Sequence, residues 1–330
     1  GQFLSNHFCL TVFTPATPGA FIPIYRSAVC EEPCHFSGMA GLAGGVRIET
    51  GLSRKSFSLT IYQAVKISKV VNTNIPGNCS FPEELGFLDS ASAHTGRTIM
   101  FKELSLLLEV TPHEISFDEI RRKVEQENIL MKSSVSGREK SFYHLKSSYG
   151  LDVQVPVFRA LRFLWDFDPR ERRMLALQCA LARDTILRAS APFILSLKVG
   201  EVAEKELLMD LVEKEYPHRY SPKTVRAISE RLLSSWTQSG HLEDKNMKTR
   251  VKATAGPASV TYALFLGYLC GVRGKLLHNT VWANVLDATD SEIQEYVYES
   301  VRKGWLIYKN AGGIVEVSFP PDFADGIRWL

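Results

Sequence analysis

The side chains best suited to a chemical role are cationic, and the densest group of them follows two serines between residues 134 and 149. Lysine and arginine bind phosphate oxygens and donate hydrogen bonds to base edges in the major groove of DNA. In a helix that begins at the serines, the first backbone N–H groups also bind phosphate. We therefore predict a DNA-binding site in this segment, formed by Ser134, Ser136, Arg138, Lys140, His144 and Lys146.

Basic residues also outnumber acidic ones between residues 223 and 252, and two more lysines flank a predicted β-hairpin near the end of the sequence. The net charge of the 330 residues is only +3, so affinity for DNA has to come from such local groups. An ordinary solvated helix face is the alternative for each group. The further candidate DNA-binding residues are Lys223, Arg226, Arg250, Lys252, Lys303 and Lys309.

Two predicted helices position the first group. Ser116 and Glu119 have the spacing of a capping box and begin the first helix. After a break at residues 128–132, a second helix begins near Ser134 and ends at Gly150. Two helices joined by a short turn, the second of them basic, indicate a helix-turn-helix unit whose second helix enters the major groove. The apolar residues expected to face the core are Phe142, Leu145 and Tyr149.

A helical connector and a further strong helix follow. Helical patterns cover residues 156–167, 169–189 and 199–215, and a helix that begins at Ser221 and Pro222 runs to Trp236. Residues 250–253 are predicted as a strand. This helix and strand suggest a second unit of the DNA-binding kind.

The segment 290–320 gives the clearest structural prediction. An amphipathic helix capped by Asp290 or Ser291 ends at Gly304, and two β-rich runs follow, separated by a hairpin-turn sequence. This order is typical of a winged helix, a module that serves in DNA binding and in protein docking. The predicted fold is therefore mostly α, with a helix-turn-helix unit, a helical connector and a C-terminal winged-helix unit with a small β-hairpin.

Residues 1–99 differ from the rest of the chain, because they are rich in proline, glycine and cysteine and carry little sustained amphipathic pattern. We predict that they form a poorly patterned extension, disordered or absent from the native protein, with Met100 as the natural start. The alternative is a small accessory domain built on residues 58–71. The predicted domains are the extension (residues 1–99), a helical domain with the helix-turn-helix (residues 100–215) and a winged-helix-like domain (residues 216–330).

The sequence offers little for catalysis or for a metal. Cys30, Cys34 and His35 have no second pair of ligands at the spacing of a zinc finger. The glycines of residues 38–45 lack the lysine and hydroxyl residue of a P-loop, and no Gly-x-Ser-x-Gly motif is present. Two pairs of carboxylates, Asp166 with Asp168 and Asp287 with Asp290, are better explained as helix caps than as an acid–base pair. We therefore predict a non-enzymatic protein without cofactor or metal.

Membrane insertion is not expected, because no apolar run reaches the ~18 residues of a bilayer-spanning helix. The six cysteines show no spacing typical of a disulfide framework, so reduced, buried thiols in a cytoplasmic protein are the simplest interpretation.

Several short motifs follow one another in an ordered series along the chain. They are Asn128-Ile129-Leu130, Ser134 to Arg138, Arg183-Asp184, Ser221 to Thr224, Leu233 to Trp236, Gly240 to Leu242, Gly267 to Leu269 and Arg273-Gly274. Over roughly residues 100–323 this series resembles the BrxA family of the BREX bacteriophage-exclusion systems. That resemblance implies a two-domain, mostly helical DNA-binding protein without catalytic activity, acting beside a methyltransferase, an ATPase and a phosphatase-like partner. Residues 1–99 depart from the family's pattern.

Residues and resemblance together predict a non-catalytic duplex-DNA-binding protein of a bacterial phage-defence system. A protein adaptor that docks other defence components without touching DNA is the alternative.

Overall fold

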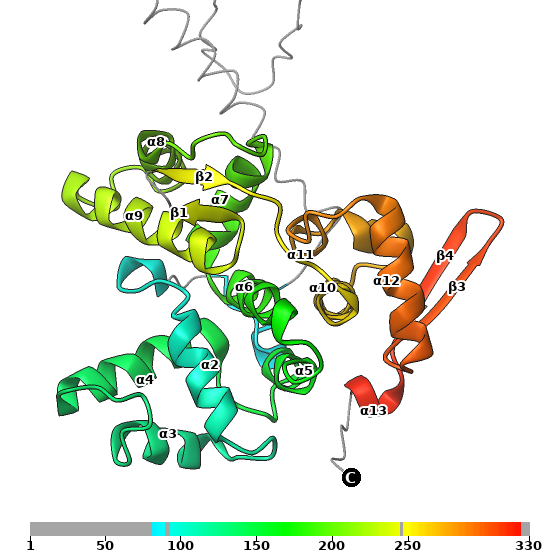
Figure 1. Ribbon diagram of the computed structural model, residues 1–330, viewed down its shortest axis with the longest axis horizontal. Helices are drawn as coiled ribbons and strands as arrows, with labels where there is room; N and C mark the ends of the chain where they lie inside the picture. The colour runs from blue at the N-terminus through cyan, green and yellow to red at the C-terminus, as the bar shows by residue number, and fades with distance from the viewer. Residues whose placement is uncertain (1–80, 90–92, 245–246, 325–330) are drawn as a thin grey trace, which may run out of the picture. The chain divides into compact units, whose positions relative to one another are not determined.

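The computed structural model describes residues 81–89, 93–244 and 247–324 (Figure 1). Helices dominate these residues, so the prediction of a mostly α-helical fold is confirmed. The strands form two small antiparallel hairpins, of which the second is the hairpin predicted near the C-terminus. Along the described part of the chain, no helix combines the length and the apolarity needed to cross a bilayer.

The helix pair predicted from residues 116–150 is present. Ser116 caps α3 in a capping box with Glu119, and Ser134 caps α4 by accepting a hydrogen bond from the Gly137 N–H. Phe142, Leu145 and Tyr149 are buried, as expected. The first three α-helices of the described residues are α2 (Phe101–Val110), α3 (Phe117–Glu125) and α4 (Val135–Tyr149).

The helix expected over residues 169–189 is interrupted at Asp184. This residue has an extended backbone, and its carboxylate accepts a hydrogen bond from the Leu187 N–H, so it ends one helix and caps the next. The elements of this region are α5 (Pro156–Leu164), η3 (Pro169–Glu171), α6 (Arg172–Arg183) and α7 (Thr185–Ser196).

A helix pair and a short hairpin follow. Ser221 caps α9 and Pro222 stands in its first turn, as predicted. The predicted strand at residues 250–253 is instead β2, which ends at Arg250 and pairs with β1 in the register Leu242↔Arg250. Val202 forms an antiparallel bridge with Thr249 at the free side of β2. The elements are α8 (Lys205–Glu215), α9 (Pro222–Gln238), β1 (Leu242–Asp244) and β2 (Lys248–Arg250).

The C-terminal region ends in the long hairpin on the right of Figure 1. Thr289 is the N-cap of α12, one residue before the predicted Asp290, because it forms a capping box with Glu292. The elements are α10 (Pro257–Leu269), η4 (Gly274–Asn279), α11 (Val281–Asn284), α12 (Asp290–Arg302), β3 (Ile307–Ala311), β4 (Ile314–Ser318) and α13 (Pro321–Ala324).

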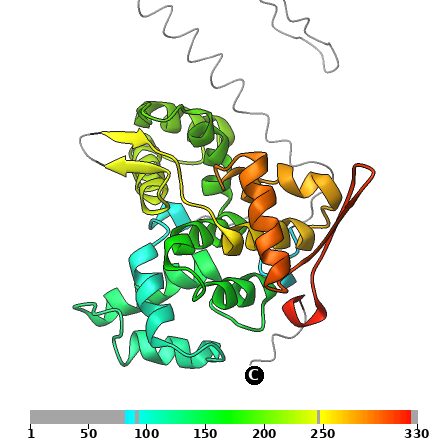
Figure 2. The same cartoon turned by 45° about the vertical axis from the view of Figure 1, so that its right-hand side comes forward.

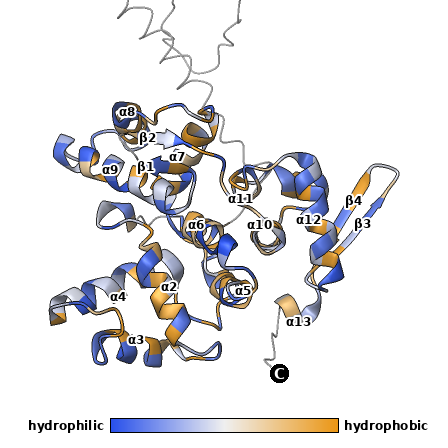
Figure 3. Ribbon diagram, in the orientation of Figure 1, coloured by the Kyte–Doolittle hydropathy of each residue, from blue (hydrophilic) through white to orange (hydrophobic). Residues whose placement is uncertain are grey.

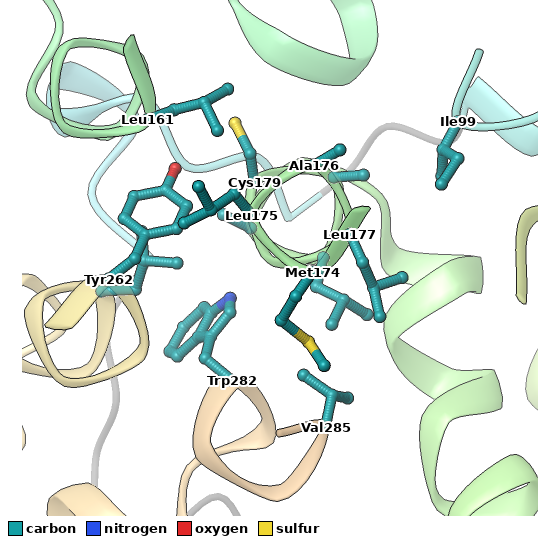
Figure 4. Packing of buried hydrophobic residues seen from close by; sticks show 14 of the residues in the cluster. Ile99, Leu161, Met174, Leu175, Ala176, Leu177, Cys179, Tyr262, Trp282 and Val285 are labelled. Atoms are coloured by element: carbon teal, nitrogen blue, oxygen red, sulfur yellow. The ribbon is translucent and has the colours of Figure 1, made fainter. Parts of the chain in front are cut away.

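Helix α6 lies at the centre of the core. Its residues from Met174 to Ala182 are all buried, and Figure 4 shows Tyr262, Trp282 and Leu161 around it. The predicted domain boundary at residues 215/216 falls between α8 and α9, and buried residues of both helices belong to the same hydrophobic cluster. In Figure 3, hydrophobic and hydrophilic colours alternate along α3, α4 and α9, as expected for helices with one buried side.

The described residues before Met100 belong to this core, which corrects the prediction that the folded region begins there. Phe87, His94 and Ile99 are buried, and η1 (Glu83–Leu85) and η2 (Ala93–Thr95) are short helical turns. The sequence missed this because the contacts of these residues are with helices far along the chain. Residues 1–80, with the Cys30, Cys34 and His35 considered for zinc, lie outside the described residues.

Candidate nucleic-acid interface

The outward side of α4 carries polar and aromatic side chains. Ser136, Lys140 and Tyr143 are exposed at helical spacing, and Ser134 is exposed at the cap. Lys140 has no carboxylate partner among the residues that the structure describes. Tyr143 was missed by the sequence analysis, although its offset by one position from the buried Phe142 indicates an outward direction. This side of α4 can therefore contact a phosphate or a base edge.

Arg138 does not share that side. It lies four residues before the buried Phe142, and its Nη1 donates a hydrogen bond to the carbonyl of Glu125 at 3.3 Å, at the end of α3. Residues four apart lie on the same side of a helix, so Arg138 is drawn inward. The structure thus places it in the turn between α3 and α4, where it closes that turn.

His144 and Lys146 are also poorly placed as contacts. His144 packs on Gly96, where an added Cβ would lie 2.5 Å from the imidazole Cε1. Burial, followed by the nearby Arg97 and Arg231, lowers the pKa of His144, so the ring is neutral at pH 7. Lys146 is exposed in the last turn, with its ammonium 5.0 Å from the centre of the Phe117 ring.

Helix α9 exposes Lys223 and Arg226 in its first half. Arg226 lies 3.2 Å from Glu230 one turn later, and Lys205 of α8 lies 3.4 Å from the same carboxylate. Lys223 has no such partner in the described part of the chain. Of the two, Lys223 is therefore the one whose charge is available to an anion.

Arg250 and Lys252 have structural partners. Arg250 is 2% exposed, and its Nη2 lies 2.8 Å from the Asp287 carboxylate, so it cannot reach DNA. The Lys252 ammonium is exposed but lies 2.7 Å from Glu292, the capping-box partner of Thr289 in α12. That ammonium and the hydrogen bonds from Thr289 lower the pKa of Glu292 to about 2.

The two lysines of the C-terminal hairpin region are exposed, and each contacts a neighbouring side chain. Lys309 lies 3.4 Å from Glu316 across the hairpin, and Lys303 lies 5.2 Å from the centre of the Trp305 ring. Helix α12 itself is acidic over most of its length. Its carboxylates belong to Asp290, Glu292, Glu295 and Glu299.

A cleft of about 420 Å³ is lined by residues of α2, of α4 and of the last turns of α9. The cations Arg97, Lys102 and Lys132 line it, with Glu103 as the one acidic lining residue among those described. Arg97 and Lys102 were not predicted as site residues, because both lie at the edge of residues 1–99, which were predicted to be an extension. The available signal was a pair of cations on either side of Met100, the predicted natural start. The remaining lining residues are Thr98, Met100, Gly137, Ser141, Ser234 and Gln238.

The cleft lies on the side of the molecule from which α4 and α9 both project. In Figures 1 and 2 these two helices are on the same side, and η2 contacts both. Arg231 of α9 reinforces the connection by donating hydrogen bonds to the carbonyls of His94 and Thr95 at 3.3 and 2.9 Å. Helix α4, through Gly137 and Ser141, and the last turns of α9, through Ser234 and Gln238, thus both line one cationic cleft, whereas Lys223 and Arg226 lie toward the other end of α9.

A serine, a histidine and an aspartate form a hydrogen-bonded chain in the core. His94 Nε2 lies 2.7 Å from the Ser235 hydroxyl, and His94 Nδ1 lies 2.8 Å from the Asp184 carboxylate. The same order activates the nucleophile of serine hydrolases. Here all three residues are at most 1% exposed, and the Ser235 oxygen also accepts a hydrogen bond from the Ile99 N–H. We interpret the chain as structural, since no substrate reaches the hydroxyl.

Metal binding finds no support in the described residues, where no three histidine, cysteine, aspartate or glutamate side chains are grouped as ligands. A comparison with models of known protein families gives no match for this chain, and a comparison with curated proteins gives none either.

Proposed function

We propose that the protein binds duplex DNA, without catalysing a reaction, through the side of the molecule formed by α4 and α9. The observation that carries the proposal is the pair of exposed lysines without carboxylate partners in the described residues, Lys140 and Lys223. They stand on helices that flank a cleft lined by further cations. Unpaired positive charge on two projecting helices, together with a cationic cleft lined by both, is the electrostatic pattern expected of a nucleic-acid-binding surface.

The order of the elements supports two DNA-binding units. Helices α3 and α4, packed together across a turn, correspond to a helix-turn-helix in which α4 is the reading helix. The order α7, Val202, α8, α9, β1 and β2, with Val202 bridged to β2, corresponds to a winged helix in which α9 takes that role. The winged unit of this proposal therefore lies earlier in the chain than the one proposed from sequence.

The C-terminal unit has a similar order, since α12 precedes the β3–β4 hairpin. Its helix is acidic, however, so a phosphate backbone would be repelled along it. Two exposed apolar side chains accompany this charge, Tyr298 at 51% and Ile307 at 46% exposure. A second candidate function, docking of another protein, is therefore favoured for this unit.

The biological setting follows from the resemblance to BrxA proteins. We place the DNA binding within a phage-defence assembly that contains a methyltransferase, an ATPase and a phosphatase-like protein. Docking by the C-terminal unit would bring such a partner to bound DNA.

The test is binding of the full chain to a fluorescently labelled duplex of arbitrary sequence, measured by anisotropy at several salt concentrations. About four to eight phosphate contacts should give a logarithmic salt slope of roughly −4 to −7, at ~0.9 counterions per phosphate. The double variant Lys140→Ala/Lys223→Ala should weaken binding by roughly 1 to 3 kcal/mol for each lysine replaced. The matched variant Lys303→Ala/Lys309→Ala, with the same change in charge, should bind like the wild type.

Absence of duplex binding at low salt would overturn the proposal and leave the docking function. Normal binding by the Lys140/Lys223 variant together with failure of the Lys303/Lys309 variant would transfer the reading surface to the C-terminal unit.

A further inference from the structure

We propose that the cleft between α4 and α9 holds backbone phosphates of the bound duplex, so that both units engage one continuous DNA. The inference rests on the proposed function and adds the contact that joins its two halves.

The cleft presents positive charge from separate elements. Arg97 precedes α2, Lys102 stands in the first turn of α2, and Lys132 lies in the turn before α4. Lys132 is already 2.8 Å from Glu103. Arg97 and Lys102 are exposed and have no carboxylate partner among the described residues, so their charge is available to a phosphate.

The far wall is built from neutral hydrogen-bonding groups of α9. The Gln238 Oε1 accepts a hydrogen bond from the Phe101 N–H at 3.0 Å, and its Nε2 donates to the Ser234 hydroxyl at 3.3 Å. These bonds fix the last turns of α9 against the start of α2. The Lys132–Glu103 ion pair connects the turn before α4 to the same helix α2, so a DNA strand bound in the cleft contacts elements that are linked through α2.

The size and composition of the cleft favour a phosphodiester over other ligands. Its volume of about 420 Å³ lies near the lower end of the ~300–1,000 Å³ typical of small-molecule sites, so it admits a phosphate with its sugar but not a folded partner. Two available cations beside hydroxyl groups are suited to phosphate oxygens. A free phosphate or a mononucleotide would offer the cleft the same phosphate group. The experiment therefore has to distinguish these small anions from the DNA backbone.

The structure supplies the variants for that experiment. Arg97→Ala/Lys102→Ala removes the two available cations. Lys198→Ala/Lys275→Ala removes the same charge from exposed positions outside the cleft. Arg97→Lys/Lys102→Arg keeps the charge and serves as the conservative variant. Thermal unfolding of each protein checks that the fold is retained.

Binding is measured on duplexes of about 10 and about 30 base pairs, that is, one and three helical turns. For the longer duplex, we expect the cleft variant to bind roughly 10- to 100-fold more weakly and to reduce the magnitude of the salt slope by about 2, since two phosphates are no longer neutralised. The charge-matched and conservative variants should keep the slope of the wild type. The shorter duplex, which presents fewer phosphates, should bind the wild type and the cleft variant with closer affinities.

The outcomes separate the two proposals. If the wild type fails to bind duplex, the proposed function is wrong and this inference falls with it. If the wild type binds and the cleft variant keeps its affinity and slope, the cleft is not a backbone site, while the proposed function stands. Calorimetric titration with inorganic phosphate and with a mononucleotide tests whether the cleft binds a small free anion instead. Saturable binding that the cleft variant loses, with duplex binding unchanged, would assign the cleft to a small anion and overturn the inference.

Discussion

His94 Nδ1 lies 2.8 Å from the Asp184 carboxylate, and the His94 backbone N–H donates to the same oxygen at 3.1 Å. Asp184 caps α7, and the other ring nitrogen of His94 faces Ser235 of α9. One histidine therefore ties the segment before α2 to two helices of the proposed winged unit. Arg97 and Lys102 follow His94 closely in the sequence, so this contact also fixes the positions of these two cations of the cleft.

We expect His94→Ala to destabilise the protein by about 3 kcal/mol, because the buried Asp184 carboxylate and Ser235 hydroxyl each lose one hydrogen-bond partner and a cavity is left in the core. Urea unfolding at neutral pH measures the change. His113→Ala is the control, since His113 lies 2.7 Å from Asp166 in a pair that is about one third or more exposed, and such pairs contribute less than about 1 kcal/mol. Equal destabilisation by the two variants would show that the buried chain has no special structural role.

The sequence predicts the local elements well where caps and amphipathic spacing agree. The helices begun by Ser116, Ser134 and Ser221 and the C-terminal hairpin depend on neighbours within a few residues, and they are present. Asp184 divides a predicted helix because its cap bond requires an extended backbone, which apolar periodicity does not reveal.

Long-range partners limit the prediction of the candidate site. Arg138 and Arg250 have the residue type of DNA contacts, yet the carbonyl of Glu125 and the carboxylate of Asp287 hold them inward. Arg97 is overlooked for the opposite reason, since its segment has no periodic pattern and is ordered by contacts with α9. Charge is visible in a sequence, but its availability depends on partners that only the fold brings together.

Gly256 and Glu171 provide a second stability prediction. The buried Glu171 carboxylate accepts hydrogen bonds from the Ser259 N–H and hydroxyl, both at 2.7 Å, at the start of α10. A Cβ on Gly256 would lie 2.5 Å from this carboxylate. We expect Gly256→Ala to cost about 2 to 3 kcal/mol, because the carboxylate has to leave the helix end.

A double-mutant cycle tests this cause. Glu171→Ala removes the obstructing carboxylate. In a protein that already carries Glu171→Ala, the Gly256→Ala change should therefore cost much less stability, which corresponds to a coupling free energy of about 1 kcal/mol or more. Additive effects measured by chemical unfolding would mean that Gly256 is needed for another reason.

His241 predicts how stability depends on pH. The ring is fully buried, with Nε2 2.8 Å from the Val285 carbonyl and Nδ1 2.9 Å from the Ser239 hydroxyl. Burial is the main cause that lowers its pKa from 6.5 to about 4. Between these values the unfolded chain binds a proton that the folded protein does not, so stability falls as the pH falls. From about pH 7.5 to about pH 5, this one histidine should account for a loss of about 2 kcal/mol.

The measurement compares urea unfolding of the wild type and of His241→Gln at the two pH values. Glutamine can donate to the Val285 carbonyl but does not titrate, so the variant should be less stable at the higher pH and lose about 2 kcal/mol less on acidification. Three other histidines with lowered pKa values, His113, His144 and His278, are present in both proteins and cancel in the comparison. An identical pH dependence in the two proteins would show that His241 is not the buried neutral group that the structure indicates.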